Sequence, residues 1–348
     1  MINHANAVLD DVSVHHTGNK TNGDEIILTK SPMDISDPVM CDLLLKFFLS
    51  PFKQSEFFNF TFSNGDANMN PMFIYAKQLF GDHGDFHVQT VNIAKHLYET
   101  SIHPQIKGGD LFVARITGME VEHKRVAAIG IFKSENRQAF LKLQHDKKNF
   151  TMDVQEGINP DKLDKGCIIF NTDEESGYKV AIFDRLNKSG EAQFWKDQFL
   201  MLKPCSDEFH HTSAFLDIAR QYVTKQLPEE FEVNKSDQID ILNKSMEYFK
   251  TRDNFEKKEF EQEVFQDEAL IKSFRKFDSA YRKENEIEPE DSFEISLPAL
   301  KKQARVFKSI LKLDKNFHIY IHGNKDLIQP GVEKDGRKFY KIYYSEEH

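Results

Sequence analysis

Five cationic side chains near the end of the chain recur at a spacing that suits the binding of phosphate groups. The intervals between them are four, three, four and three residues, in the order Lys301, Arg305, Lys308, Lys312 and Lys315. Such intervals place side chains on one face of an α-helix. A row of positive charge on a rigid helix can neutralise the phosphates of a nucleic acid. These five residues are therefore the first candidates for DNA contacts.

A single helix from Ser296 to Lys315 would hold this row in place. Ser296 suits the N-cap position and Pro298 suits the first turn of a helix. An apolar stripe repeats at the same intervals, each residue lying one position before a cation. It is formed by Leu300, Ala304, Phe307 and Leu311. We expect this stripe to face the core of the protein and to anchor the cationic face.

A second group of cations lies in a part of the chain with strand-like patterns. It comprises Lys124, Arg125, Lys142, Lys147 and Lys148. In a strand, Lys142 would point to the opposite side from Leu141 and Leu143 because successive side chains alternate between the two faces. These five residues are the second set of candidates for contacts with DNA phosphates.

Acidic and basic residues are segregated along the sequence. The chain has 46 Lys and Arg against 56 Asp and Glu, a formal net charge of −10. Residues 299–345 hold eleven basic and four acidic residues (net +7), and residues 229–294 hold eleven basic and twenty acidic residues (net −9). Such segregation indicates a polarised surface. The cationic face either binds nucleic acid, or is solvated, or docks on the acidic block of its own or a neighbouring chain.

The sequence lacks the motifs of the common enzyme classes. It has no GxxxxGK[ST] phosphate loop, no GxGxxG, no GxSxG and no HExxH. A metal-dependent nuclease would need converging carboxylates and a nearby lysine, for which Asp110, Asp146 and Lys147 are the candidates. We rank this possibility third, and expect no enzyme activity.

The histidines give no clear metal site either. Asp82, His83, Asp85 and His87 lie close together, but the glycine among them favours a turn that opens a helix with Asp85 as its N-cap. We therefore expect neither a metal ion nor a cofactor.

Length and composition favour two domains and an α+β fold. A chain of 348 residues exceeds the usual size of one hydrophobic core. Strand patterns predominate before residue 203, and Phe-rich helical patterns follow residue 207. We expect an α+β domain at residues 1–205 with a mainly antiparallel sheet and flanking helices. Residues 206–348 should form a mostly helical domain, with the acidic helices, the basic helix and a small terminal β-sheet.

The strand patterns between residues 111 and 184 indicate an antiparallel meander, because six of them follow one another with short turns. The mean hydropathy is −0.57, without an apolar run of the ~20 residues that a membrane span needs. No secretory signal is expected, and three widely spaced cysteines suit a reducing cytoplasm. We expect no membrane association.

Several segments together resemble a known bacterial family. They are INHANAVLDDVSVHH near the start, KGGDLFVARITG, KRVAAIGIFKSE, EGINPDKLDKGCIIFN, and CSDEFHHTSAFLDIARQYV after the domain boundary. Their order and spacing resemble the nucleoid-associated protein family of the NdpA type, whose members are recovered with the compacted chromosome. The most specific pieces are Gly108-Gly109-Asp110 and Ile158-Asn159-Pro160. Neither is a catalytic signature.

The resemblance implies a cytoplasmic, nucleoid-located and non-enzymatic protein that associates with DNA as a homodimer. Together with the cations, it predicts binding of double-stranded DNA through phosphate contacts and without sequence preference. The competing hypothesis is a protein-interaction module that recruits a basic partner through the acidic helices at residues 229–294.

Overall fold

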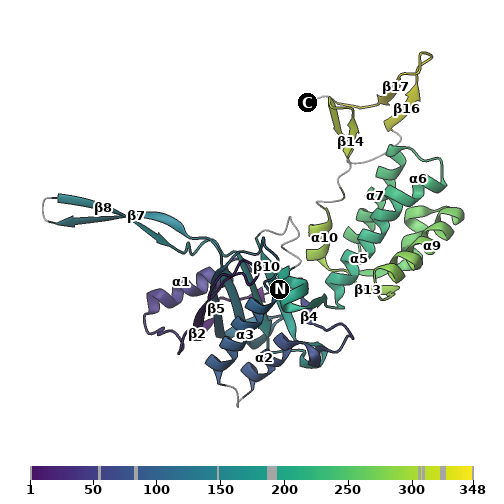
Figure 1. Ribbon diagram of the computed structural model, residues 1–348. Coiled ribbons are helices and arrows are strands. Elements are labelled where there is room, and N and C mark those ends of the chain that lie inside the picture. The colour runs from purple at the N-terminus through teal and green to yellow at the C-terminus, as the bar shows by residue number, and fades with distance from the viewer. Residues whose placement is uncertain are drawn as a thin grey trace. The chain divides into compact units, whose positions relative to one another are not determined.

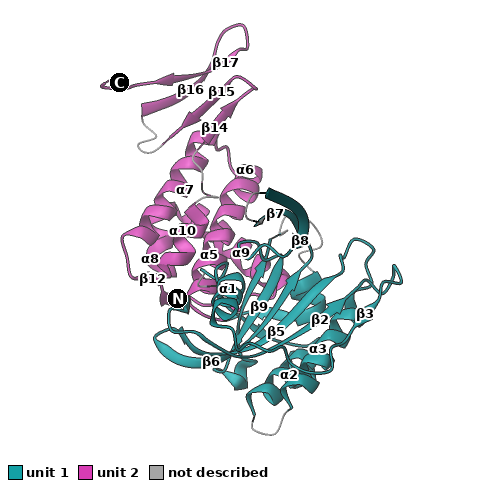
Figure 2. Cartoon of the chain, turned by 90° about the vertical axis from the view of Figure 1, so that its left-hand side faces the viewer, with its two compact units in different colours: residues 1–205 teal, residues 206–348 magenta. Residues whose placement is uncertain are grey.

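The computed structural model describes residues 2–53, 56–81, 85–146, 149–185, 194–304, 307, 310–321 and 327–346. The chain divides into two compact units, residues 1–205 and residues 206–348 (Figure 2). The first unit is built on an antiparallel sheet with flanking helices, and the second is mostly helical with small sheets near its end. The expected α+β class is therefore confirmed.

One antiparallel sheet organises the first unit. Its order is β11-β4-β10-β9-β6-β5-β2-β3, and β1 also pairs with β5. The strands are β1 (Ile2–Asn3), β2 (Val8–Thr17), β3 (Ile26–Ile27), β4 (Phe58–Phe60), β5 (Gly109–Val121), β6 (Lys124–Ser134), β9 (Lys165–Phe170), β10 (Lys179–Asp184) and β11 (Leu202–Pro204). The central strands are apolar on both faces, because helices cover each face.

Alternating side chains of β5 and β6 divide between two hydrophobic clusters. Val113 and Ile131 belong to the cluster that contains residues of α2 (Pro71–Phe80), α3 (Phe86–Thr100) and the π-helical turn η3 (Phe194–Leu200). Phe112 and Phe132 belong to the cluster of α1 (Pro38–Leu49). In this second cluster the Phe132 ring stacks on the ring of Phe48, with centroids 4.2 Å apart. Two short 3-10 turns, η1 (Ala67–Met69) and η2 (Glu174–Ser176), complete the unit.

Short polar side chains fix the starts of the three helices. Asp37 accepts a hydrogen bond from the backbone N–H of Val39 at the start of α1, and Asn70 accepts one from Met72 at the start of α2. Asp85 accepts one from Val88 (3.1 Å), which confirms its expected role as the N-cap of α3. These bonds satisfy donors that a helix leaves free at its first turn.

A two-stranded hairpin leaves the sheet between β6 and β9. It consists of β7 (Gln138–Asp146) and β8 (Asn149–Gly157), which pair only with each other, whereas β6 pairs directly with β9 (Figure 1). We call this hairpin the arm. The expected continuous meander is thus wrong at this point. Asp164 accepts hydrogen bonds from the backbone N–H groups of Glu135 (2.7 Å) and Asn136 (3.1 Å), so these groups leave the ladder and the chain turns outward.

A buried cluster of charges lies where the arm begins. The ammonium group of Lys133 is 3.2 Å from the Glu135 carboxylate, and that of Lys165 is 3.7 Å from the same carboxylate and 3.4 Å from Asp184. Lys133 also donates a hydrogen bond to the backbone carbonyl of Lys107. Burial lowers the pKa of Lys133, although Glu135 opposes that shift. Each charge therefore depends on its partners, because an unpaired buried charge is costly.

The second unit is a helical bundle around a core rich in aromatic rings. The rings of Phe255, Phe260 and Phe274 surround Phe215, at centroid distances of 4.2, 5.0 and 6.0 Å. The helices are α5 (Glu208–Gln221), η4 (Tyr222–Gln226), α6 (Leu227–Glu230), α7 (Lys235–Lys250), α8 (Lys257–Phe260), η5 (Glu261–Phe265), α9 (Glu268–Glu284) and α10 (Leu297–Ala304). The strands β12 (Asn254–Glu256) and β13 (Ser292–Glu294) pair beside them.

The expected single helix from Ser296 to Lys315 is wrong. Helix α10 ends at Ala304, and residues 310–313 form the strand β14 (Ile310–Leu313), which pairs with β15 (Phe317–Tyr320). The expected burial of Leu300, Phe307 and Leu311 is confirmed, but Ala304 is exposed. Leu311 packs against α7 from a strand, so burial of this residue outweighed the local helical pattern.

We predict that the exchange Glu135→Gln lowers the free energy of unfolding by about 3–5 kcal/mol, because it leaves two buried lysines short of a carboxylate. Adding Lys133→Met to this variant should restore part of the stability, since the uncompensated charge is then removed as well. Urea denaturation of the wild type and the two variants measures both effects. A decrease below about 1 kcal/mol for Glu135→Gln would show that the cluster is not electrostatically coupled.

Candidate nucleic-acid interface

Two hairpins form the C-terminal end of the described part of the second unit, and they share a small core. The first is β14–β15, and the second consists of β16 (Ile328–Val332) and β17 (Lys338–Ile342). Leu311 of β14 and Ile328 of β16 are buried together with Ile239 of α7. Burial and the nearby Asp237, in the first turn of α7, raise the pKa of Tyr340 in β17. The two hairpins are therefore anchored on the N-terminal half of α7, and we call them the hairpin module.

The first hairpin turns a polar face outward. Lys312 lies directly opposite His318, and Ile310 lies opposite Tyr320, whereas the alternate residue Leu311 faces the core. Both Lys312 and His318 are exposed, and so is Lys315 in the turn that joins the strands. Asp314 has a φ of 50° in this turn, which lets the chain reverse within three residues.

The second hairpin carries aromatic rings and a cation in alternation. Phe339, Lys341 and Tyr343 follow one another at every second position, and the Lys341 ammonium group is 4.8 Å from the centroid of the Tyr343 ring. The Phe339 ring lies against the backbone of Gly331, where a Cβ atom would be 2.2 Å from it. The glycine therefore lets the ring lie flat on the strand. Tyr344, which follows Tyr343 in the sequence, is 71% exposed.

Exposed aromatic rings beside cations are typical of surfaces that bind nucleic acids. The cations neutralise phosphates, and the rings offer faces on which bases stack. Phe317 and Tyr320 are each more than 60% exposed, although large aromatic side chains are mostly buried in folded proteins. The hairpin module thus combines both kinds of contact on one small structure.

The structure brings only some of the sequence candidates together. Lys312 and Lys315 lie in the hairpin module, and Lys301 lies on α10 with its side chain exposed. The remaining candidates of these two groups fall outside the described residues: Arg305, Lys308, Lys147 and Lys148. The cationic row therefore does not form one helix face.

The second set of candidates is dispersed over the first unit. Lys124 and Arg125 begin β6, and Lys142 lies in the middle of β7, beyond the other end of β6. With eleven residues in β6, these ends are roughly 35 Å apart. All three side chains are exposed. They do not form one site with each other.

The acidic block finds its cationic partners largely within itself. Glu261 binds the guanidinium group of Arg275 (2.6 Å), and the buried Asp278 binds Arg282 and Lys257 (both 2.6 Å). Within the described residues, Lys301, Lys312 and Lys315 have no carboxylate within 4.0 Å. Within the described chain these three lysines therefore form no ion pair with the acidic block, and docking on the acidic block of a neighbouring chain stays an alternative.

The carboxylates proposed for a nuclease do not converge. Asp110 forms an ion pair with Arg137 (2.8 Å), which lies just before the arm, and a hydrogen bond with His16 Nδ1 (2.9 Å). Asp146 is the last residue of β7, about 30 Å farther along the arm at 3.3 Å per residue. Across the described ranges, no group of three His, Cys, Asp or Glu residues is arranged to hold a metal ion. The predicted arrangement of Asp110 and Asp146 is thus wrong.

The histidine cluster in the sequence has a structural role where it is described. The Nε2 atom of His87 donates a hydrogen bond to the backbone carbonyl of Thr29, and its Nδ1 atom is hydrogen-bonded to the Ser13 hydroxyl, both at 2.9 Å. Its neighbour His15 is held by Thr90 (3.0 Å), and burial together with His87 lowers the pKa of His15 to about 4. Asp82 and His83 lie outside the described residues.

Sequence reasoning missed the aromatic half of the hairpin module and the cation Lys341. The signal was present in the segment KFYKIYY, because period-two alternation alone places Phe339, Lys341 and Tyr343 on one face of a strand. The helical pattern of residues 296–315 indicated only cations as candidates for DNA contacts.

The antiparallel sheet of the first unit and the helical bundle of the second place the chain among α+β proteins. The model of the family described as nucleoid-associated protein YejK (NA37) matches residues 13–336, nearly the whole chain, and the chain belongs to this family. The resemblance to a nucleoid-associated family is thereby confirmed. A search of curated proteins gave no match. Among the described helices, none is long and apolar enough to cross a bilayer.

We predict that Lys301→Gln, Lys312→Gln and Lys315→Gln together leave the melting temperature almost unchanged, because exposed and unpaired charges contribute little to stability. Leu311→Ala should instead cost about 2–5 kcal/mol of local stability, since its side chain joins the hairpins to α7. Hydrogen exchange of the β14–β17 amides, with calorimetry of both variants, measures these effects. A much lower melting temperature of the Gln variant would show that the lysines have a structural role.

Proposed function

We propose that the protein binds double-stranded DNA through phosphate contacts, without sequence preference. The observation that carries this proposal is the set of exposed lysines without carboxylate partners, Lys301, Lys312 and Lys315, to which the hairpin module adds Lys341. Cations that form no ion pair within the described chain are available for phosphates, and their contacts release counterions from the duplex. Such contacts read no base edges, so they favour binding that is tolerant of sequence.

The place of action follows from the family. A nucleoid-associated protein acts on the bacterial chromosome, so we place this chain in the cytoplasm, at the nucleoid. We propose that it binds without cleaving, because the candidate residues for a nuclease are far apart, with Asp110 in β5 and Asp146 at the end of β7. A homodimer would present two hairpin modules and could bridge two duplex segments.

Single-stranded DNA is a second candidate ligand of the same surface. It is favoured by the exposed rings of Phe317, Tyr320, Phe339, Tyr343 and Tyr344. Bases in a duplex are already stacked, whereas those of a single strand are free to stack on such rings. Tyr320→Ala with Phe339→Ala should weaken single-strand binding more than duplex binding if stacking contributes.

The competing class is a protein-interaction module that uses the acidic helices at residues 229–294. Glu261 and Asp278 are occupied by internal ion pairs, which reduces the charge that this block can offer to a partner. If this alternative holds, removing cations from the hairpin module will leave binding to naked DNA unchanged.

For the wild type, we predict that the logarithm of duplex affinity falls linearly with the logarithm of salt concentration. Exchanging Lys312, Lys315 and Lys341 for Gln should make this slope shallower by about 0.9 for each phosphate that the protein no longer neutralises. Fluorescence anisotropy with unrelated duplexes at several salt concentrations measures slope and sequence tolerance together.

The control for this experiment removes the same charge elsewhere in the second unit. Lys272, Lys276 and Lys283 are exposed on α9, and their exchange for Gln should leave the slope close to that of the wild type. A strongly preferred sequence with a flat salt response, or an equal effect of both triple variants, would contradict phosphate binding by the hairpin module.

We predict no cleavage of supercoiled or linear DNA by the purified protein with Mg²⁺ or Mn²⁺. Two-metal cleavage needs carboxylates that share metal ions about 4 Å apart, and Asp110 is already engaged by Arg137 and His16. Agarose gels over several hours provide the measurement. Reproducible nicking that disappears with Asp110→Ala or Asp146→Ala would restore the nuclease hypothesis.

A further inference from the structure

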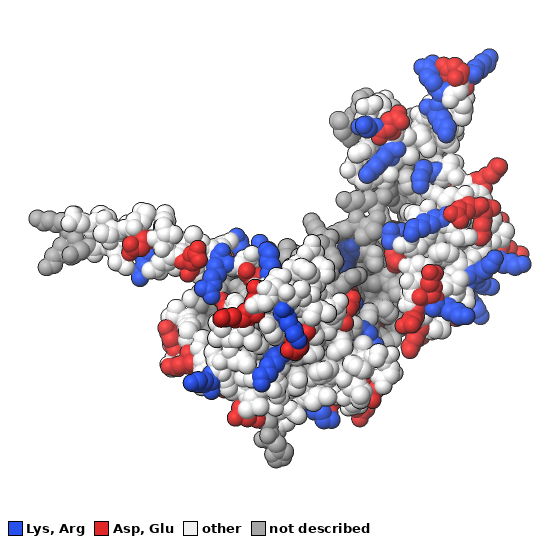
Figure 3. Space-filling model, in the orientation of Figure 1, with Lys and Arg blue, Asp and Glu red and all other residues white. Residues whose placement is uncertain are grey.

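The arm exposes large apolar side chains that a folded protein normally covers. Five of them are 59–72% exposed: Leu141, Leu143, Phe150, Met152 and Val154. In Figure 1 the arm extends from the sheet of its own unit, and Figure 3 shows mostly uncharged surface along it. Isolated two-stranded hairpins are marginally stable in water, so this ribbon needs a partner.

Strand register places these side chains on one face. Leu141 lies directly opposite Val154 and Leu143 lies opposite Met152, and nearer the tip the His145 ring contacts the Phe150 ring at 5.8 Å. Directly opposed residues of antiparallel strands share a face. We call this the apolar arm face. The other face is mostly polar, with pairs such as Lys142 opposite Asp153 and Gln144 opposite Thr151.

The base of the arm is held firmly. Besides the backbone bonds to Asp164, the side chain of Asn136 donates to Asp164 (2.9 Å), and that of Asn159 donates to Gln138 (2.8 Å). These bonds join the segments before and after the hairpin to each other and to the sheet. The apolar arm face is therefore presented on an anchored ribbon.

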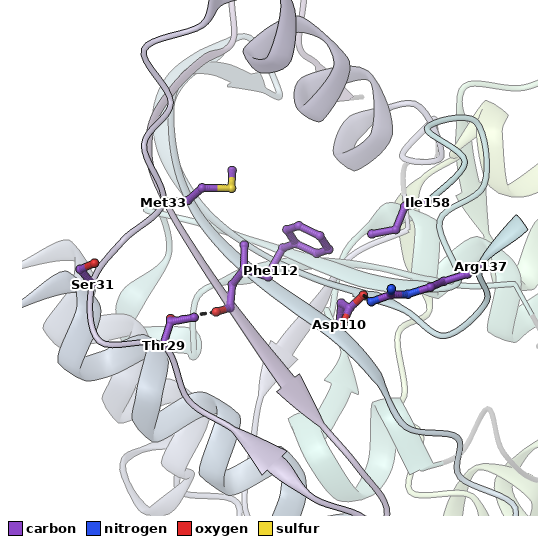
Figure 4. Close-up of a pocket in the computed structure, with 8 residues that line it drawn as sticks. Thr29, Ser31, Met33, Asp110, Phe112, Arg137 and Ile158 are labelled. Atoms are coloured by element: carbon purple, nitrogen blue, oxygen red, sulfur yellow. Dashed lines mark hydrogen bonds and ion pairs between the residues drawn. The ribbon is translucent and has the colours of Figure 1, made fainter. Parts of the chain in front are cut away.

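A cavity of about 440 Å³ lies beside this base (Figure 4). Met33, Phe112 and Ile158 supply its apolar walls, and the ion pair of Asp110 with Arg137 lies along one side. Arg137 immediately precedes β7, and Ile158 immediately follows β8. The apolar surface of the arm thus continues into a recess of the same unit.

We propose that the apolar arm face binds the apolar arm face of a second copy of this chain. The two arms lie face to face and antiparallel about a two-fold axis, so that each tip reaches the base of the other arm. This proposal is independent of DNA binding, because it uses the first unit and none of the hairpin module.

The arm face is complementary to itself in this arrangement. Rotation about the two-fold axis places Leu141 opposite Leu143 of the second copy, and Val154 opposite Met152 of the second copy, so large apolar groups meet in the centre. At the ends, the bulky His145 meets the small Ala139, and Phe150 meets Glu156 beside the recess that Ile158 lines. A two-fold interface requires such self-complementarity.

The size of the surface also suits a second copy. Each apolar arm face exposes on the order of 400 Å² of apolar surface, comparable with the largest patches on ordinary monomers. Two such faces, with the recesses at the bases, reach roughly the 1,000 Å² that a specific interface needs. The sparse charges on this face leave little for nucleic acid to bind.

Sedimentation velocity of the full chain without DNA tests the proposal. The wild type should be a dimer at micromolar concentration, and Leu143→Glu should raise the dissociation constant at least about 100-fold, because each dimer would bury two carboxylates. Gln144→Glu is the matched control on the polar face and should remain dimeric. Because both side chains are exposed, circular dichroism should show that both variants are folded.

Cysteine cross-linking tests the arrangement itself. Leu141→Cys with Leu143→Cys should give a covalent dimer under mild oxidation, whereas Lys142→Cys with Gln144→Cys should not. A monomeric wild type at 50–100 µM would overturn the proposal, whether the arm then binds another protein or lipid vesicles. A dimer that survives Leu143→Glu, or equal cross-linking of both cysteine pairs, would overturn it as well.

Discussion

The arm depends on a balance of buried charges at its base. Lys133 and Lys165 share the Glu135 carboxylate, and Asp164 binds the backbone at the same turn. Burying these groups is costly, and mutual pairing with well-placed hydrogen bonds offsets the cost. An apolar cluster could stabilise the sheet equally well, but it would not fix the direction in which the chain leaves it. The ionic cluster thus supplies orientation more than stability.

In each unit a well-packed core carries an attached element to which we assign a binding role. In the first unit, helices on both faces bury most of the central strands, so the sheet can hold a projecting ribbon at one end. In the second unit, packed rings around Phe215 stabilise the bundle, and α7 extends from it to hold the hairpin module. Each proposed binding surface is therefore made of one or two β-hairpins attached to a larger core.

The sequence predicted local structure well where pattern and burial agreed. The N-cap at Asp85, the strand patterns of the sheet and the helix α7 at residues 235–250 all follow local rules. Prediction from the sequence failed where contacts between residues far apart in the chain determine the local structure. Leu311 belongs to a strand because Ile239 and Ile328 bury it there, and β7 leaves the sheet because β9 pairs with β6. For the same reason the five cations were predicted on a single helix face, and the aromatic rings beside them were missed.

The small core beneath the hairpin module has a consequence for how easily this module opens. Among the described residues, three apolar side chains are buried there, Ile239, Leu311 and Ile328, so the module should open at a lower free energy than the aromatic bundle that carries it. Proteases cleave segments that open locally. Limited digestion would then remove the lysines and exposed rings first and leave a folded remainder with its arm intact. If the hairpin module binds DNA and the arm joins two copies, as proposed above, proteolytic trimming would therefore remove the DNA contacts and leave the dimer in place.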